Sequence, residues 1–151
     1  MSRIKVIQEQ EAEGRLKVIY DQLTSSRGKL AEVHKIQSLR PESIVKHMHL
    51  YMEIMFSKSE LSRARREMIA VVVSAANQCE YCQTHHGSAL NHYWKDDQSV
   101  QQLRNDFYGL DLSTADLALC EYAKQVTLNP GEAESTDVTE VLKKEGFSDP
   151  S

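Results

Sequence analysis

Cys79 and Cys82 form a C-x-x-C pair, the part of this sequence whose residue types and spacing point most directly to chemistry. In a reducing compartment such a pair is typical of redox chemistry or metal binding rather than of a structural disulfide. We expect both cysteines at the start of a helix, where the N-terminal end of the helix favours negative charge and lowers the pKa of a thiol. The spacing therefore predicts a reversible disulfide.

A histidine and a glutamate stand at spacings that would let them assist these thiols. His86 follows Cys82 by four residues, so on a helix its imidazole shares the face of that sulfur and can exchange a proton with it. If the chain folds back at Asn77 and Gln78, a rise of roughly 1.5 Å per residue brings Glu67 within about one helical turn of His86 in height. The four residues would then combine paired nucleophiles, a base and a group that orients the base, directly or through a water.

The same side chains also suit other sites. Cys79, Cys82 and His86 could supply three zinc ligands. The fourth ligand would come from a partner chain or from one of the other histidines, His34, His47 and His49. Taken alone, C-x-x-C can also be structural, and a glutamate is more often a solvated helix residue.

Several neighbouring residues are expected to have ordinary roles. Cys120 lies among leucines and alanines in a predicted helix and is expected to be a buried small hydrophobe. His85 points roughly 100° away from His86 on a helix, so we expect it at the surface. Arg63, Arg65 and Arg66 are expected to be a solvated helix start.

Composition excludes several classes of function. The net charge of -4 with both signs interspersed gives no footprint for nucleic acid. The longest apolar run, residues 68–76, is too short to cross a bilayer, and the charged N-terminus does not form a signal peptide. A length of 151 residues suffices for one domain with a core. We therefore expect a soluble cytoplasmic protein that binds neither nucleic acid nor membrane.

Apolar residues recur at intervals of three and four, without the alternation of strands, so the sequence predicts an all-α fold. The expected helices cover about 9–24, a short segment within 30–39, a helix opened by Pro41, 62–76, 79–94, 99–107, one from Ser113 to about 128, and 136–145 ended by Gly146. The third of these should bury Ile44, Met48, Tyr51, Met52 and Met55, with the methionines in the core or at a subunit contact. The helix over 62–76 is nearly all apolar after Met68, which predicts a central position in the core.

At Glu67, Cys79, Cys82 and His86 the chain resembles the AhpD-like alkylhydroperoxidase family of the carboxymuconolactone decarboxylase superfamily. The family motif is a glutamate, an eleven-residue gap and then C-x-x-C-x-x-x-H, which this sequence matches in full. Segments 28–34, 41–43, 61–63 and 92–94 are similar to the branch of peroxidase-related enzymes. The resemblance implies one AhpD-like domain over 1–151, with its core motif at about 60–95, in a helical subunit that forms a homo-trimer or homo-hexamer.

The resemblance also implies a reaction. Glu67 would act through water and His86 to deprotonate Cys82, which attacks a small hydroperoxide and is then resolved by Cys79 as a disulfide. The helix-end argument by itself favours Cys79 as the more acidic thiol. No cofactor and no resident metal are implied. The reductant would be a thiol or a lipoyl-bearing or other redox partner protein.

Two departures from the family pattern bear on this expectation. Characterised peroxidases that resemble this chain carry a histidine before the second cysteine, where this sequence has Tyr81. Relatives also continue beyond residues 146–151 with one more amphipathic helix, so a C-terminal helix is expected to be missing. Two other functions stay open: a lactone decarboxylase of the same superfamily, and a zinc-binding or redox-sensing module without turnover.

Overall fold

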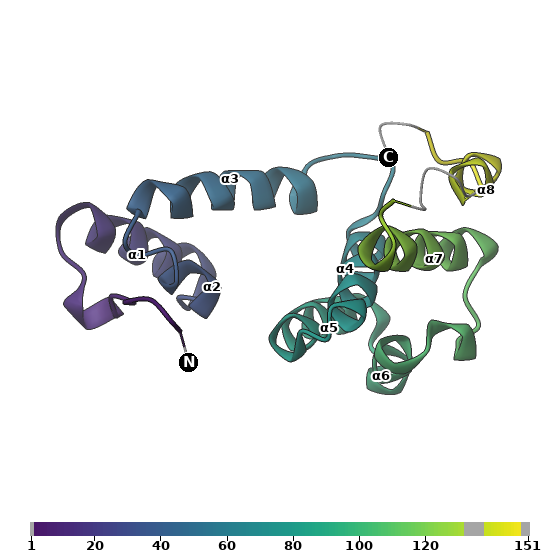
Figure 1. Ribbon diagram of the computed structural model, residues 1–151, viewed down its shortest axis with the longest axis horizontal. Helices are drawn as coiled ribbons and strands as arrows, with labels where there is room; N and C mark the ends of the chain where they lie inside the picture. Colours follow the sequence, from purple (N-terminus) through teal and green to yellow (C-terminus); the bar gives the residue numbers. More distant parts are fainter. Residues whose placement is uncertain (1, 132–137, 149–151) are drawn as a thin grey trace. The chain divides into compact units, whose positions relative to one another are not determined.

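The computed structural model describes residues 2–131 and 138–148. Over these residues the chain forms eight α-helices and two 3-10 turns and contains no strand, which confirms the all-α prediction (Figure 1). The chain divides into two compact units, Met1–Ser57 and Lys58–Ser151. Each unit has its own apolar core, and the prediction of a single domain over 1–151 stays a prediction. None of the helices in the described part has the length and hydropathy that crossing a bilayer requires.

The N-terminal unit is built on two helices that pack against each other. Its elements are the 3-10 turn η1 (Glu9–Glu11) and the helices α1 (Gly14–Arg27), α2 (Glu32–Lys35) and α3 (Pro41–Phe56). The core between α1 and α3 consists of Ala12, Leu16, Ile19, Tyr20, Leu23 and Ile44. The Tyr20 hydroxyl donates a hydrogen bond of 3.1 Å to the carbonyl of Ile7, which holds the N-terminal segment to this core.

The predicted boundaries of the first helix are wrong at both ends. A 3-10 turn occupies the expected first turn, and α1 begins only at Gly14. At the other end the serines do not stop the helix, because the Ser26 hydroxyl donates to the Gln22 carbonyl one turn back instead of competing with the helix. The helix ends at Gly28, whose φ of 77° suits a left-handed cap.

The apolar stripe of α3 is narrower than predicted. Ile44 and Met55 are buried and Met48 and Tyr51 are half-buried, but Met52 is 44% exposed. At 100° per residue Met52 lies roughly 80° around the helix from Ile44, at the edge of the stripe that the other four residues complete. The prediction that Met52 is buried is therefore wrong.

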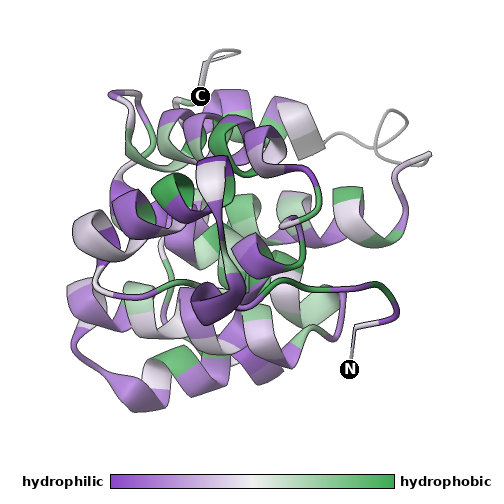
Figure 2. Ribbon diagram, turned by 90° about the vertical axis from the view of Figure 1, so that its left-hand side faces the viewer, coloured by the Kyte–Doolittle hydropathy of each residue, from purple (hydrophilic) through white to green (hydrophobic). Residues whose placement is uncertain are grey.

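The C-terminal unit is arranged around one central helix. Its elements are α4 (Arg63–Ala76), α5 (Glu80–Trp94), α6 (Asp97–Asn105), the 3-10 turn η2 (Phe107–Gly109), α7 (Thr114–Leu128) and α8 (Val138–Lys144). Helix α4 packs against α5, α6 and α7, and α8 packs against α7 (Figure 1). Several helices carry both strongly polar and strongly apolar residues, drawn purple and green in Figure 2. The core around α4 includes Met68, Val71, Leu90 and Cys120, so the predicted central position of this helix is confirmed.

Side-chain caps fix where these helices begin. The hydroxyl of Ser62 accepts from the backbone of Arg65 at 3.2 Å, and that of Ser113 accepts from Asp116 at 3.1 Å. Helix α6 begins two residues before its predicted start because Asp96 is its cap and accepts from the backbone N–H groups of the second and third residues that follow it. At the end of the chain, Gly146 has a φ of 91° after α8, while residues 136 and 137 of the predicted helix lie outside the described residues.

Candidate active site

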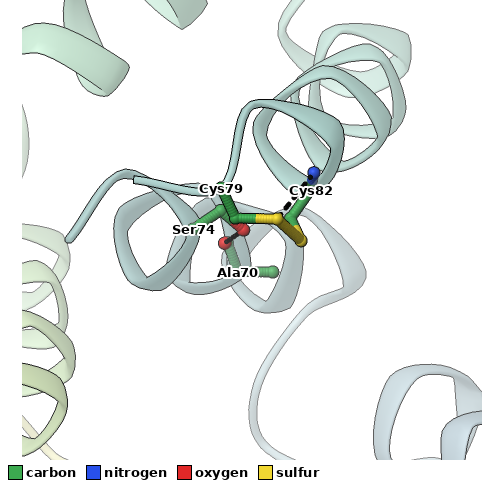
Figure 3. Close-up of a disulfide and its surroundings, with 4 residues drawn as sticks. All are labelled: Ala70, Ser74, Cys79 and Cys82. Carbon is green, nitrogen blue, oxygen red and sulfur yellow. Dashed lines mark hydrogen bonds between the residues drawn. A yellow bond between two sulfur atoms is a disulfide. The ribbon is translucent and has the colours of Figure 1, made fainter. Parts of the chain in front are cut away.

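The turn between α4 and α5 brings the predicted site residues together. The chain leaves α4 through Gln78, whose φ of 55° lies in the left-handed region, and the backbone N–H of Cys79 then donates to the carbonyl of Ser74 at 2.9 Å. The Ser74 hydroxyl bonds the Ala70 carbonyl at 2.5 Å, so its polar group is satisfied within α4 (Figure 3). This tight connection makes α4 and α5 a helical hairpin.

Cys79 and Cys82 are joined by a disulfide at the start of α5 (Figure 3). Their Cα atoms are 5.3 Å apart, well within the range that a disulfide spans without backbone movement. Cys79 is the N-cap of α5, and its sulfur accepts a hydrogen bond of 3.3 Å from the backbone N–H of Cys82. Both cysteines are half-buried.

Glu67 and His86 meet directly across the hairpin. The Glu67 Oε2 and His86 Nδ1 atoms are 2.7 Å apart, a hydrogen bond without an intervening water. Glu67 is 0% exposed, whereas the His86 side chain is 28% exposed. A carboxylate removed from water in this way requires charged or hydrogen-bonding partners. Glu67 and His86 are therefore in direct contact, as the rise per residue of the two helices allowed.

Arg63 is the site residue that the sequence reasoning missed. It lies one turn before Glu67 on α4 and forms an ion pair with Oε1, the carboxylate oxygen that His86 does not contact. Its side chain is only 18% exposed, so the prediction that it is solvated is wrong. The spacing of Arg63 and Glu67 could have indicated this ion pair. Residues at i and i+4 on a helix are neighbours, and these two have opposite charges.

Of the other two arginines of this segment, Arg66 is buried and Arg65 is partly solvated, with a side chain 34% exposed. Arg66 is 9% exposed and donates through Nε to the Leu61 carbonyl at 3.1 Å. Arg65 binds Asp116 of α7, with Nε and Oδ1 2.7 Å apart. Both arginines thus bind residues packed around α4. Their charge alone was therefore a poor guide to their exposure.

Three remaining residues can be compared with their predicted roles. His85 is exposed on α5, as predicted, and its ring meets that of Tyr81 edge to face with centroids 4.2 Å apart. Tyr81 is also exposed, so this aromatic pair lies on the outer side of the first turns of α5. Cys120 is completely buried, which confirms its predicted role, and burial together with the charges of Asp116 and Glu121 raises its pKa to about 12.

Cavities in this unit lie beside other residues. One of about 490 Å³ is a half-open hollow lined by residues of α4, α7 and α8, and another of about 210 Å³ is lined by residues of α4, α6 and α7. Neither is lined by Glu67, Cys79, Cys82 or His86. In the described part of the chain no three His, Cys, Asp or Glu side chains are grouped in a way that could hold a metal ion.

Comparison with known proteins places this architecture. Residues 45–105 match the model of the carboxymuconolactone decarboxylase family. A crystal structure of an alkylhydroperoxidase AhpD core, an uncharacterized peroxidase-related protein from Ralstonia eutropha JMP134, is 25% identical and superposes with a TM-score of 0.84 over 98% of this chain and 77% of that one. The family match and this neighbour support an AhpD-like member of the carboxymuconolactone decarboxylase superfamily. The family resemblance drawn from the motif is thus confirmed.

A second AhpD-like neighbour is similar to the same degree. It is an uncharacterized peroxidase-related protein from Silicibacter sp. TM1040, 27% identical, with a TM-score of 0.82 over 99% of this chain and 81% of that one. No curated protein matches the chain. The segment that matches the superfamily model contains the α4–α5 hairpin with all four motif residues, so the family match and the candidate site coincide.

Proposed function

We propose that the protein is a thiol-dependent peroxidase that reduces small hydroperoxides with Cys79 and Cys82. The observation that carries this proposal is that the disulfide and the Glu67–His86 hydrogen bond occur in one helical hairpin. The AhpD-like family and two neighbours described as peroxidase-related support it. The paired sulfurs supply two electrons, and the imidazole and carboxylate move the proton.

In the proposed reaction the Cys82 thiolate attacks the terminal oxygen of the hydroperoxide. A sulfur–oxygen bond forms, the oxygen–oxygen bond breaks, and the alcohol leaves after taking up a proton. Cys79 then attacks the Cys82 sulfenic acid, which forms the disulfide and releases water. A dithiol reductant, either a small thiol or a lipoyl-bearing or other redox protein, returns both cysteines to thiols by exchange.

The proton relay assigned here uses the geometry of the hairpin. His86 turns Nδ1 to the carboxylate, so Nε2 is the ring nitrogen that takes the Cys82 proton and delivers it to the leaving alkoxide. Glu67 stabilises the imidazolium that forms meanwhile. Arg63 balances the buried carboxylate while His86 is neutral, so that the site carries no unpaired charge between turnovers.

The division of labour between the cysteines is part of the proposal. His86 follows Cys82 by one helical turn, which favours Cys82 as the peroxidatic residue. The hydrogen bond from the Cys82 N–H to the Cys79 sulfur favours a thiolate on Cys79, which suits its role of attacking the sulfenic acid. We further propose that the reaction takes place in the cytoplasm, where thiol reductants keep such pairs reduced.

The relay is tested by steady-state consumption of cumene hydroperoxide with dithiothreitol as reductant. Glu67→Gln should lower the rate near neutral pH by about 10²–10⁴-fold, the usual worth of general base assistance, and His86→Ala should do the same. The loss should shrink as the pH rises, because the thiolate then forms without help. The double variant should be little worse than either single one, since the two residues act as a unit.

Glu13→Gln, in which an exposed carboxylate of the N-terminal unit is removed, is the matched control and should retain the full rate. A Glu67→Gln enzyme with unchanged rates at every pH would exclude the relay.

The Cys82→Ser variant should be inactive. The Cys79→Ser variant should form one sulfenic acid on Cys82 and stop, which mass spectrometry with a sulfenic-acid trap can detect. Trapping on Cys79 in the converse variant would reverse the two roles. Peroxide consumption that survives both serine variants would contradict the proposed function and leave the decarboxylase alternative, which needs no cysteine pair.

A further inference from the structure

The cavity of about 210 Å³ between α4, α6 and α7 combines two cations with an apolar wall. Arg104 and Lys124 line it together with one carboxylate, Asp106. The rest of the lining consists of the polar residue Asn105 and five apolar residues: Val72, Ala75, Ala76, Leu103 and Phe107. Two positive groups facing one negative group leave this small space with an excess of positive charge.

Arg104 has hydrogen-bonding capacity to spare. Its Nη2 donates to the carbonyl of Gln83 at 2.8 Å, and its Nη1 reaches the Gln101 side chain at a longer 3.4 Å. Its Nε is buried and has no hydrogen-bond partner among the described residues. A guanidinium offers five N–H groups in a planar fork that matches a carboxylate. Because Nε has no exposed surface, a ligand with two oxygens would use the second N–H of Nη1 and of Nη2.

Lys124 supplies the second charge at the edge of the same space. Its ammonium lies 5.5 Å from the centre of the Phe107 ring, a contact that holds the cation beside the apolar wall. The side chain is exposed, so it can change rotamer towards a ligand while the surrounding helices stay in place. Asp106 is the only acidic residue of the lining. Its Oδ1 accepts a hydrogen bond from the backbone N–H of Tyr108 and caps the turn η2, so one of its two carboxylate oxygens is already engaged.

The guanidinium of Arg104 also lies close to the hairpin that holds the disulfide. Gln83, its partner on α5, is one residue beyond Cys82 and hydrogen-bonds back to the carbonyl of Cys79. The contact is possible because residue 87 is glycine: a Cβ atom there would lie 2.0 Å from Nη2. Arg104 therefore connects the cavity to the first two turns of α5.

We propose that this cavity is a binding site for a small organic carboxylate. The carboxylate group pairs with Arg104 and Lys124, and the organic part packs on the wall formed by Val72, Ala75 and Phe107. The volume is below the several hundred cubic ångströms that drug-sized ligands occupy, so the ligand is small. This site is separate from the cysteine chemistry and does not depend on the proposed peroxidase activity.

Binding of benzoate to the full-length oxidised protein tests the proposal, with benzamide as the neutral molecule of the same shape. Isothermal titration calorimetry at low salt should show saturable binding of benzoate and at least tenfold weaker binding of benzamide. Lys124→Gln should weaken benzoate about tenfold, as expected for the loss of one partly desolvated charge partner. Lys144→Gln, which removes an exposed cation of α8, is the matched control and should bind benzoate like the wild type.

Arg104→Gln should abolish benzoate binding, and its thermal midpoint shows whether the variant is still folded. Lys124 is an exposed residue of α7, so its variant keeps the test valid if the arginine variant unfolds. Equal affinity for benzoate and benzamide, no saturation up to about 10 mM, or unchanged binding by Lys124→Gln would each overturn the proposal. Chemical-shift changes confined to α7 and α8 would place benzoate in the larger cavity and overturn it as well.

Discussion

The three cysteines of this chain show how strongly the surroundings of a side chain decide its chemistry. Cys79 and Cys82 are half-buried at a helix start, where the backbone N–H of Cys82 donates to the Cys79 sulfur. Cys120 has no exposed surface, and burial raises its pKa to about 12, so near neutral pH it stays protonated and unreactive. One residue type thus serves as core packing at one position and as the proposed reagent at the other two.

We expect thiol titration with a disulfide-exchange reagent to separate these environments. The reduced native protein should react rapidly at two thiols, and the third should react only after denaturation, because Cys120 must first be exposed. The oxidised protein should show one thiol in denaturant. A Cys120→Ala variant should lose only the slow thiol. Three rapid thiols in the native protein, or three thiols in the denatured protein before and after mild oxidation, would contradict this arrangement.

At this scale the sequence predicted the members of the site but not all of their contacts. Glu67 and His86 could be placed together because helical rise converts residue numbers into heights on either side of a turn. Arg63 was missed because a charged residue in a first helical turn is usually solvated. Its burial depends on the neighbouring helices of the unit, which a pattern within one helix does not contain.

The contact between α5 and α6 depends on a missing side chain. At Gly87 the absence of a Cβ atom lets the Arg104 guanidinium lie against the helix and reach the Gln83 carbonyl. Glycine inside a helix costs about 1 kcal/mol relative to alanine, so this contact has to offset that cost. The two helices are therefore joined by a charged hydrogen bond that only glycine permits.

Gly87→Ala should displace Arg104 rather than the backbone, because the atom in the way is the far end of a flexible side chain. The gain in helix propensity and the loss of a charged hydrogen bond of about 1.5–3 kcal/mol oppose each other, so we expect a net destabilisation of about 1 kcal/mol in urea unfolding. In the background of Arg104→Ala the same substitution should instead stabilise. Gly131→Ala, where a Cβ would meet nothing within 4 Å, is the control. Equal effects of Gly87→Ala in both backgrounds would show that Arg104 does not use this space.

Element boundaries were predictable where a side chain defines them. Ser62 and Ser113 cap α4 and α7 as the sequence indicates, because a hydroxyl before an apolar run can satisfy the first N–H groups. The start of α1 could not be predicted, since its N-cap, Glu13, makes no side-chain cap bond. Asp96 could have been recognised as the cap of α6, but aspartates in a polar run also form turns.

On the scale of the whole molecule, helix α3 exposes four large apolar side chains: Leu50, Met52, Ile54 and Phe56. At about 100° per residue, Leu50 and Ile54 lie on one flank of the helix and Met52 and Phe56 on the other. Soluble monomers seldom expose so many large apolar residues along one helix. Leu50 and Ile54 are one turn apart and so share a face. This surface is where we expect subunits to meet in a homo-trimer or homo-hexamer.

Light scattering coupled to size exclusion at micromolar concentration should therefore show the mass of a homo-trimer or homo-hexamer rather than that of a monomer. Such assemblies have closed symmetry. The double variant Leu50→Glu/Ile54→Glu should shift the protein to smaller species, because two carboxylates cannot be buried in an apolar contact. Val18→Glu, at an exposed apolar position of α1, should leave the assembly unchanged. A monomeric wild type would remove this role for α3.

The sulfur of Cys79 has two bonding partners, since it is half of the disulfide and also the acceptor for the N–H of Cys82. A disulfide sulfur is a weak acceptor, whereas a thiolate at the same position is a strong one. In the proposed redox cycle, reduction would therefore strengthen a main-chain hydrogen bond in the first turn of α5, and oxidation would weaken it. We expect this amide to carry the oxidation state to the helix, so that a protein that binds this turn would distinguish the reduced molecule from the oxidised one.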